Sequence, residues 1–154
     1  MNTDDEQTSP EADAVREVNL AMWTAVEEGD IDALGAIWAD GADAASVTCV
    51  HPGWPALHGR PEILRSYALI MANTSYVQFF LTDVEVKLAG EVAVLSCTAN
   101  MLTGMAEEDG GDEAGFAGGR AVVTNVFRRT PGGWRLWLHH ASPVMAEVDA
   151  EEEI

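Results

Sequence analysis

Residues 47–67 read VTCVHPGWPALHGRPEILRSY, and this stretch decides the order of elements along the chain. Residues 46–51 favour a strand, and the prolines and glycine of residues 52–55 end it in a rigid loop that carries Trp54. Pro61 then opens a helix with apolar residues at helical spacing. The stretch therefore predicts a strand, a loop and a helix in turn.

Two further helices are expected before this stretch. Ser9 and Pro10 are suited to an N-cap and a first helical position, and apolar residues recur at helical spacing from there until Gly29. Asp30 can cap a shorter helix, which the GAD of residues 41–43 ends. The N-terminal part of the chain is thus predicted to be helical.

Four strands are expected after it, at residues 75–88, 91–103, 119–129 and 134–142. They are rich in Val, Leu, Phe, Thr and Trp and are separated by turn sequences and by an acidic, glycine-rich hairpin tip at 104–119. A curved sheet of this kind can bury one face only by wrapping it around helices. We therefore predict an α+β fold, with three N-terminal helices packed on a curved, mainly antiparallel sheet and a hollow between them.

Length and charge bound the organisation of the chain and its partners. The 154 residues fit one domain, which we place at residues 10–145 between a disordered acidic tail at 1–9 and an acidic tail at 146–154. Twenty-six acidic and eight basic residues give a formal net charge of −18, which repels phosphate backbones and anionic lipid. No nucleic-acid or membrane partner is expected.

Location and thiol chemistry follow from what the sequence lacks. The first residues have neither the basic start nor the apolar run of a signal peptide, and no stretch approaches the roughly 18 apolar residues of a membrane span. The expected location is the cytoplasm. Cys49 and Cys97 have neither metal-ligand spacing nor the density of a disulfide scaffold, so reduced thiols within strands are expected.

Histidines are the natural candidates for proton transfer, because their unshifted pKa lies near neutrality. His51 ends the first strand immediately before Pro52, and His58 lies on the far side of the Trp54 loop. Both can face a common opening. Alternatively, both can pin the loop through hydrogen bonds to backbone carbonyls.

Alternation along the last two strands selects further polar residues. It places His140 on the same face as Trp134 and turns His139 toward solvent or a second subunit. Asn125 shares a face with Phe127, and its amide can donate to a ligand oxygen without a change of charge. The candidate catalytic residues are therefore His51, Asn125 and His140.

The walls of the hollow are expected to be mostly aromatic. The candidate ligand-binding residues are Trp23, Trp38, Trp54, His58, Tyr67 and Phe127. Three histidines with a carboxylate would suffice for a metal, but the sequence has no His-x-x-x-His or clustered carboxylate pattern, so neither a metal nor another cofactor is predicted. The expected partner is a small molecule.

The segments VTCVHPGWPALHGRPEILRSY at 47–67 and TNVFRRTPGGWRLWLHHASP at 124–143 resemble the SnoaL-like members of the nuclear transport factor 2-like superfamily. The likeness covers residues 12–145 and extends to ketosteroid isomerase and to the association domain of calcium/calmodulin-dependent kinase II. It implies a cone-shaped fold with a helix-lined pocket, and a homodimer, often formed through the outer face of the sheet.

The two relatives imply different functions, one catalytic and one non-catalytic. Relative to ketosteroid isomerase, the general base falls on His51, and the acid that donates to the oxyanion falls on Asn125, which can also donate. The isomerase tyrosine falls near Met22, which cannot. Relative to the kinase association domain, which catalyses nothing, the pocket histidine falls on His140.

Three interpretations are open. An isomerase-, lyase- or cyclase-like enzyme would use His51 as general base on a small apolar carbonyl or polyketide-like compound. A non-catalytic module would hold a metabolite or a peptide end in the same pocket. An oligomerising scaffold would need neither catalysis nor a bound ligand. The pocket interpretations depend on the imidazole of His51 and the amide of Asn125 facing one enclosed space.

Overall fold

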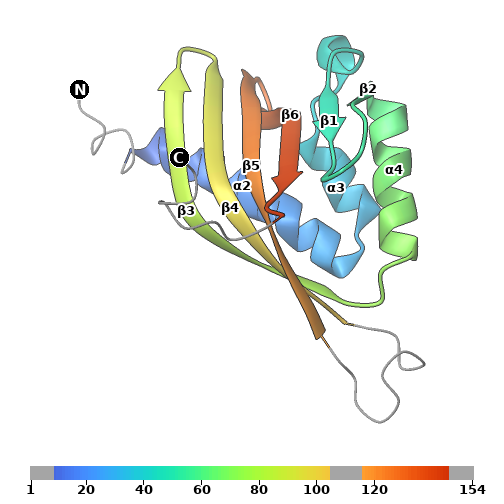
Figure 1. Ribbon diagram of the computed structural model, residues 1–154. Coiled ribbons are helices and arrows are strands. Elements are labelled where there is room, and N and C mark those ends of the chain that lie inside the picture. The colour runs from blue at the N-terminus through green and yellow to red at the C-terminus, as the bar shows by residue number, and fades with distance from the viewer. Residues whose placement is uncertain (1–8, 105–115, 146–154) are drawn as a thin grey trace.

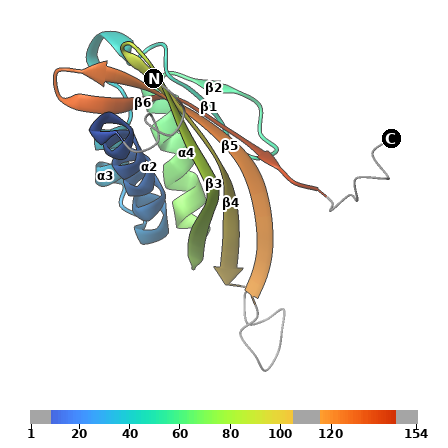
Figure 2. The same cartoon turned by 90° about the vertical axis from the view of Figure 1, so that its left-hand side faces the viewer.

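The computed structural model describes residues 9–104 and 116–145. Three helices, α2 (Pro10–Glu28), α3 (Ile31–Ile37) and α4 (Arg60–Ala72), pack on one side of a curved six-stranded sheet (Figures 1 and 2). The other elements are η1 (Gly41–Asp43), β1 (Thr48–Val50), β2 (Leu57–His58), β3 (Val77–Ala89), β4 (Val92–Gly104), β5 (Phe116–Thr130) and β6 (Gly133–Pro143). The predicted fold class is confirmed.

Other predictions lie at the limits of the described residues. The predicted tails, apart from Ser9, and most of the predicted hairpin tip at 104–119 fall outside them. Cys49 and Cys97 are free, buried thiols within β1 and β4, as expected. No helix in the described part of the chain is both long and apolar enough to cross a membrane.

Both ends of α2 and the start of α3 follow the capping residues that the sequence predicts, whereas α3 ends at Ile37 and the GAD of residues 41–43, expected to end it, forms η1 instead. The Ser9 hydroxyl accepts a hydrogen bond from the backbone N–H of Ala12 at 3.0 Å, and Gly29 ends α2 in the left-handed conformation with φ of 67°. The Asp30 carboxylate accepts from the N–H of Ala33 at 3.0 Å and starts α3. These caps set the length of α2 and the direction in which the chain leaves it.

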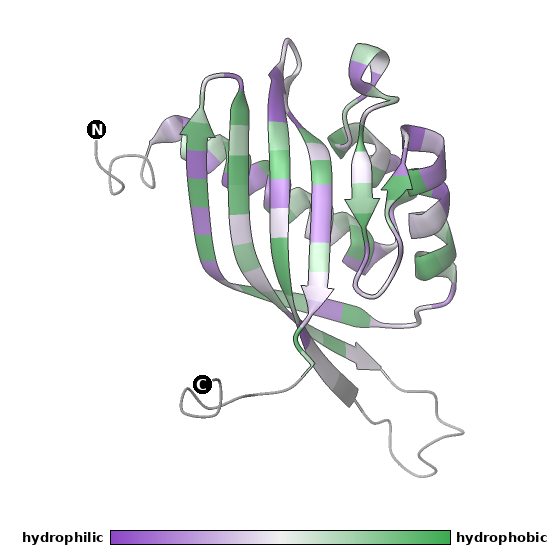
Figure 3. Ribbon diagram, turned by 45° about the horizontal axis from the view of Figure 1, so that its top comes forward, coloured by the Kyte–Doolittle hydropathy of each residue, from purple (hydrophilic) through white to green (hydrophobic). Residues whose placement is uncertain are grey.

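The sheet has the strand order β2-β1-β6-β5-β4-β3. The predicted antiparallel meander of β3 to β6 is confirmed, and the short β1 lies parallel to β6, with Cys49 beside His139. The sequence did not predict β2, which pairs antiparallel with β1 within the segment expected to be a loop. Figure 3 shows hydrophobic and hydrophilic residues alternating along β3 and β5, which is typical of a sheet with one buried face, whereas β4 is hydrophobic along most of its length.

A β-bulge interrupts the pairing of β5 with β6. The register shifts between Val126 and Phe127, and Trp137 is the extra residue on β6. The indole Nε1 of Trp137 donates to Ser46 Oγ at 2.8 Å, and the Arg128 guanidinium lies 4.7 Å from the indole ring centre. Because one residue is added, every side chain beyond the bulge changes face.

The bulge corrects the prediction for the paired histidines. Before it, Trp134 and Leu136 are buried; after it, His139 and Ala141 are buried and His140 is exposed. The expectation that His140 shares the inner face with Trp134, and that His139 faces solvent, is wrong. The alternation was counted along a regular strand, and the extra residue reverses it.

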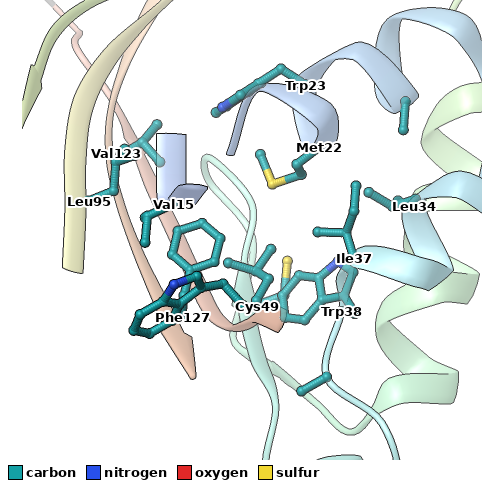
Figure 4. Packing of buried hydrophobic residues seen from close by; sticks show 14 of the residues in the cluster. Val15, Met22, Trp23, Leu34, Ile37, Trp38, Cys49, Leu95, Val123 and Phe127 are labelled. Carbon is teal, nitrogen blue, oxygen red and sulfur yellow. The ribbon is translucent and has the colours of Figure 1, made fainter. Parts of the chain in front are cut away.

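The core lies between α2, α3 and the concave face of the sheet. Figure 4 shows Val15 and Met22 of α2, Ile37 beside Trp38 at the end of α3, and Val123 and Phe127 of β5 converging there. Trp38 and Phe127 are 1% and 0% exposed. Both are therefore parts of the packed interior rather than of an open pocket.

Candidate functional site

A cavity of about 450 Å³ lies between the second half of α2, α4, the loop after β1 and the concave face of the sheet. Its wall is mainly apolar, and it includes Met22, Trp23, Trp54, Ile70, Phe79 and Ala141. Within the described residues, the polar side chains that face it are His51, Tyr67 and His139, whereas Arg120 alternates with the inward Ala121 on β5 and lies on the outer face. A volume of this size and an apolar wall with few polar groups are typical of small-molecule sites.

Two other hollows offer less chemistry. One of about 330 Å³ adjoins the cavity beyond Val26 and Phe79, and an open groove of about 470 Å³ lies beside Arg60 and Arg135. Neither is lined by a histidine. The buried imidazoles therefore lie on the wall of the first cavity.

His51 is held on the cavity wall by the end of β1 and by α4. It is 5% exposed, and its Nε2 lies 2.8 Å from Ser66 Oγ, whose hydroxyl donates to the carbonyl of Ile63 at 2.6 Å. The single hydroxyl proton is thus used, so Nε2 must donate and Nδ1 keeps a lone pair. Burial lowers the pKa of His51 to about 4, so the ring is neutral near pH 7.

Tyr67 supplies a hydroxyl beside this imidazole. Its ring centre lies 4.7 Å from that of His51, and its oxygen accepts a long contact of 3.9 Å from the Cys49 thiol. Burial, and then the adjacent Cys49, raise the pKa of Tyr67 well above its usual value. Burial also raises the pKa of Cys49 to about 12. Tyr67 therefore stays a hydrogen-bond donor, and Cys49 stays a thiol without nucleophilic character.

His139 is the second imidazole of the wall. Its Nδ1 lies 2.6 Å from Asn125 Oδ1, and the Asn125 Nδ2 group donates to Asn19 Oδ1 at 2.7 Å. Burial, followed by the charges of His51 and His140, lowers the pKa of His139 to about 3. The cavity thus carries two neutral imidazoles, with ring centres 6.4 Å apart.

Asn125 does not reach the cavity. It is 0% exposed and is not one of the lining residues. The expectation that its amide faces the same space as His51 is wrong. Asn125 lies opposite His139 in the β5–β6 register, and its amide is hydrogen-bonded to His139 and Asn19. Asn125 is connected to the cavity through His139.

The remaining predicted residues separate into two groups. Trp23, Trp54 and Tyr67 line the cavity, whereas Trp38 and Phe127 lie in the core. His58 is on β2, outside the cavity, with its Nδ1 3.3 Å from Thr48 Oγ1, and the exposed His140 is also outside it.

Sequence reasoning missed His139. The pair of adjacent histidines indicated that one of them faces inward, but the bulge at Trp137 decides which one. Within the described residues, no group of three or more His, Cys, Asp or Glu side chains could hold a metal ion. The acid–base side chains that face the cavity are the imidazoles of His51 and His139 and the phenol of Tyr67.

Comparison with known families gives this arrangement a context. The family described as SnoaL-like domain matches residues 15–147. The chain belongs to this family. The matched residues include most of α2, the other helices and all six strands.

Solved structures support the same fold, and one curated protein is similar in sequence. This SnoaL-like domain is similar to a proposed dehydratase of the nuclear transport factor 2-like family from Streptomyces avermitilis, with 53% identity, a TM-score of 0.82 and coverage of 88% of this chain and 98% of that one. It is also similar to a proposed calcium/calmodulin-dependent protein kinase type II association domain from Thiobacillus denitrificans, with 25% identity, a TM-score of 0.69 and coverage of 84% and 94%. The F-box protein SKIP8 of Arabidopsis thaliana is 21% identical over 134 residues, which are 87% of this chain and 51% of that protein, so the chain spans about half its length. The predicted nuclear transport factor 2-like fold is confirmed.

Proposed function

We propose that this SnoaL-like domain is an isomerase- or lyase-type enzyme that moves a proton next to the carbonyl group of a small, mostly apolar, polyketide-like compound. One observation carries the proposal. His51, with an unprotonated ring nitrogen, and Tyr67, with a hydroxyl that can donate, lie with ring centres 4.7 Å apart on the wall of one apolar cavity. A base beside a donor is the minimum that such a reaction requires.

In the proposed reaction, Tyr67 and His51 have different roles. The Tyr67 hydroxyl donates to the carbonyl oxygen and stabilises the negative charge that develops there. Nδ1 of His51 takes a proton from the adjacent carbon; the C–H bond breaks, an N–H bond forms, and the electron pair enters the enolate. Return of the proton to another carbon completes an isomerisation. If the substrate carries a β-hydroxyl group, that group leaves with the same proton as water and a carbon–carbon double bond remains.

Elimination is the favoured outcome. The 53% identical protein from Streptomyces avermitilis carries a proposed dehydratase activity, and a dehydratase performs this elimination. The apolar wall supports the same assignment, because exclusion of water strengthens the contact between Tyr67 and the developing charge.

Solvent exchange tests the proposal. In D₂O, the protein is expected to introduce deuterium at the carbon next to the carbonyl of 3-hydroxy-1-phenylbutan-1-one and to form 1-phenylbut-2-en-1-one, followed by NMR. His51→Gln and Tyr67→Phe are each expected to lower the exchange rate about a hundredfold. His58→Gln, outside the cavity, is the matched control and should keep the wild-type rate. Equal exchange by the wild type and His51→Gln would remove the assignment of the base.

Non-catalytic binding is the second candidate, and the burial of both imidazoles, which are 5% and 3% exposed, favours it. The pKa values of about 4 for His51 and about 3 for His139 make both imidazoles weak bases. A binding module predicts that the same ketone quenches the tryptophan fluorescence of the wild type saturably, while neither deuterium exchange nor product is seen. The two measurements together separate the two functions.

We also propose a homodimer formed through the outer face of the sheet. Phe80 and Val122 are 51% and 52% exposed there, on β3 and β5. Each is next in sequence to an inward residue, Phe79 and Val123 respectively, so both point away from the helices. Exposed apolar side chains on a sheet face are suited to a second copy of the same surface.

A further inference from the structure

Three buried polar side chains form a chain that ends at the cavity. Asn19 of α2, Asn125 of β5 and His139 of β6 are 1%, 0% and 3% exposed. Burial of polar groups is unfavourable unless they are hydrogen-bonded, and apolar side chains would fill the same space at lower cost. His139 is the member that lines the cavity, so the chain connects the interior to the ligand site.

The direction of the hydrogen bonds fixes the state of the imidazole. Because Nδ2 of Asn125 donates to Asn19 Oδ1 at 2.7 Å, the amide turns its oxygen toward His139. That oxygen can only accept, so Nδ1 of His139, at 2.6 Å, must carry the proton and donate. In the neutral ring Nε2 then has a lone pair, and it makes no hydrogen bond within the described residues.

We propose that Asn125 and Asn19 are positioning residues that hold His139 in its Nδ1–H tautomer, so that Nε2 accepts a hydrogen bond from a hydroxyl group of the ligand. The proposal rests on the proposed function in taking a small molecule as the occupant of the cavity. It adds the chemical class of that molecule and a residue that recognises it.

The polar groups of the cavity then select complementary groups on the ligand. Tyr67 offers a proton and suits a carbonyl oxygen, whereas Nε2 of His139 and Nδ1 of His51, the latter 3.8 Å from the Cys49 sulfur, offer lone pairs and suit a hydroxyl or an acidic C–H. The ring centres of the two histidines are 6.4 Å apart, so one small molecule can contact both. A small hydroxy ketone with an apolar body fits this pattern, and a simple ketone leaves Nε2 of His139 without a donor.

The tautomer can be measured without any ligand. In the full chain labelled with ¹⁵N-histidine, the signals of His139 are identified by their loss in His139→Gln and their retention in His140→Gln. We expect a protonated Nδ1 and an unprotonated Nε2 at pH 7. A proton on Nε2 in place of Nδ1 would overturn the proposal.

Two substitutions test whether Asn125 sets this state. Asn125→Asp keeps an acceptor toward Nδ1, and Asn19 can turn its amide to donate to the new carboxylate. We expect the Nδ1–H tautomer to persist and the pKa of His139 to rise by about one unit or more, because a negative charge faces the ring. Asn125→Leu removes the acceptor and is expected to lose the Nδ1–H tautomer. Retention of that tautomer in a folded Asn125→Leu protein would show that Asn125 does not set it, and failure of Asn125→Asp to retain it would show the same.

Recognition of the hydroxyl is tested with a matched pair of compounds. Tryptophan fluorescence titrations compare 3-hydroxy-1-phenylbutan-1-one with its 3-methoxy analogue, which cannot donate. The hydroxy compound is expected to bind the wild type at least about tenfold more tightly, and His139→Leu should remove that difference while His140→Gln keeps it. Equal binding of the two compounds, or binding of neither, would overturn the hydroxyl assignment.

The outcomes separate this proposal from the proposed function. If the wild type prefers the hydroxy compound but shows no deuterium exchange, the cavity recognises the ligand without catalysis. Exchange that depends on His51, without any hydroxyl preference at His139, would leave the enzyme in place and remove the role of the Asn19–Asn125–His139 chain.

Discussion

The two buried imidazoles make the stability of the protein depend on pH. Burial lowers the pKa of His51 to about 4 and of His139 to about 3, from a usual value of 6.5. Between pH 6.5 and the lowered pKa of each histidine, the unfolded chain binds protons that the folded chain does not. The contribution of the two histidines to the free energy of unfolding is therefore fully present above pH 6.5. It falls as the pH decreases toward about 4, by up to ~1.4 kcal/mol per pH unit for each histidine.

Urea denaturation at several pH values between 7.5 and 5 measures this effect. The free energy of unfolding of the wild type is expected to fall over this range, and His139→Gln should show a shallower slope because one of the titrating groups is gone. His140→Gln removes a neighbouring but exposed histidine and should keep the wild-type slope. Identical slopes for His139→Gln and the wild type would mean that His139 is not held neutral by burial.

The residues that the sequence predicted correctly are those fixed by strong local signals. His51 follows β1 directly and is buried two residues after the buried Cys49, and the helical spacing that follows Pro61 places Tyr67 on the buried face of α4. Asn125 was correctly identified as an inward polar residue. Its role was not predictable, because that role depends on Asn19, which is 106 positions away in the chain.

At the level of elements, the β-bulge marks the limit of prediction from periodicity. Alternation through β5 is regular and places Val123, Asn125 and Phe127 inside, as expected. In β6 the same rule fails beyond Trp137, whose ring is held by Ser46 and Arg128 from other parts of the chain. These contacts are tertiary, so no local pattern in the last strand could have predicted the exchange of the two histidines.

Helix ends give a second test at this level. Gly29 adopts φ of 67°, and a Cβ there would meet nothing within 4 Å, so Gly29→Ala introduces backbone strain without a clash. We expect a loss of about 1 kcal/mol in the free energy of unfolding. Gly35, inside α3, has no such conformation, and its Cβ would make ordinary contacts with Leu64 and Arg60.

Gly35→Ala is therefore the matched control and is expected to increase the free energy of unfolding by up to about 1 kcal/mol, through helix propensity. Urea denaturation of both variants measures the two effects under the same conditions. A Gly29→Ala protein as stable as the wild type would argue against the left-handed cap.

For the whole molecule, the order of elements determined the layers but not the division between core and cavity. The prediction of three helices on the concave side of the sheet followed from the pattern of strands and helices (Figure 2). It assigned Trp23, Trp38 and Phe127 alike to the pocket walls. Phe127 is instead buried on the inner face of β5, and Trp38 is buried beside Leu136 of β6 and Tyr67 of α4, while Trp23 faces the cavity from α2. Whether an aromatic residue belongs to the core or to the cavity wall depends on the distance between the curved sheet and the helices at that position.

The outer face of the sheet provides the last prediction. If Phe80 and Val122 meet a second copy, light scattering of the wild type at micromolar concentration should give twice the 16.5 kDa mass of the chain. Val122→Lys places charges in that interface and is expected to give the monomer mass, with little effect on folding because Val122 is 52% exposed. Leu69→Lys, at a 57% exposed position on α4, is the control and should leave the mass unchanged. A monomeric wild type, or a dimeric Val122→Lys protein, would place any self-association on another surface.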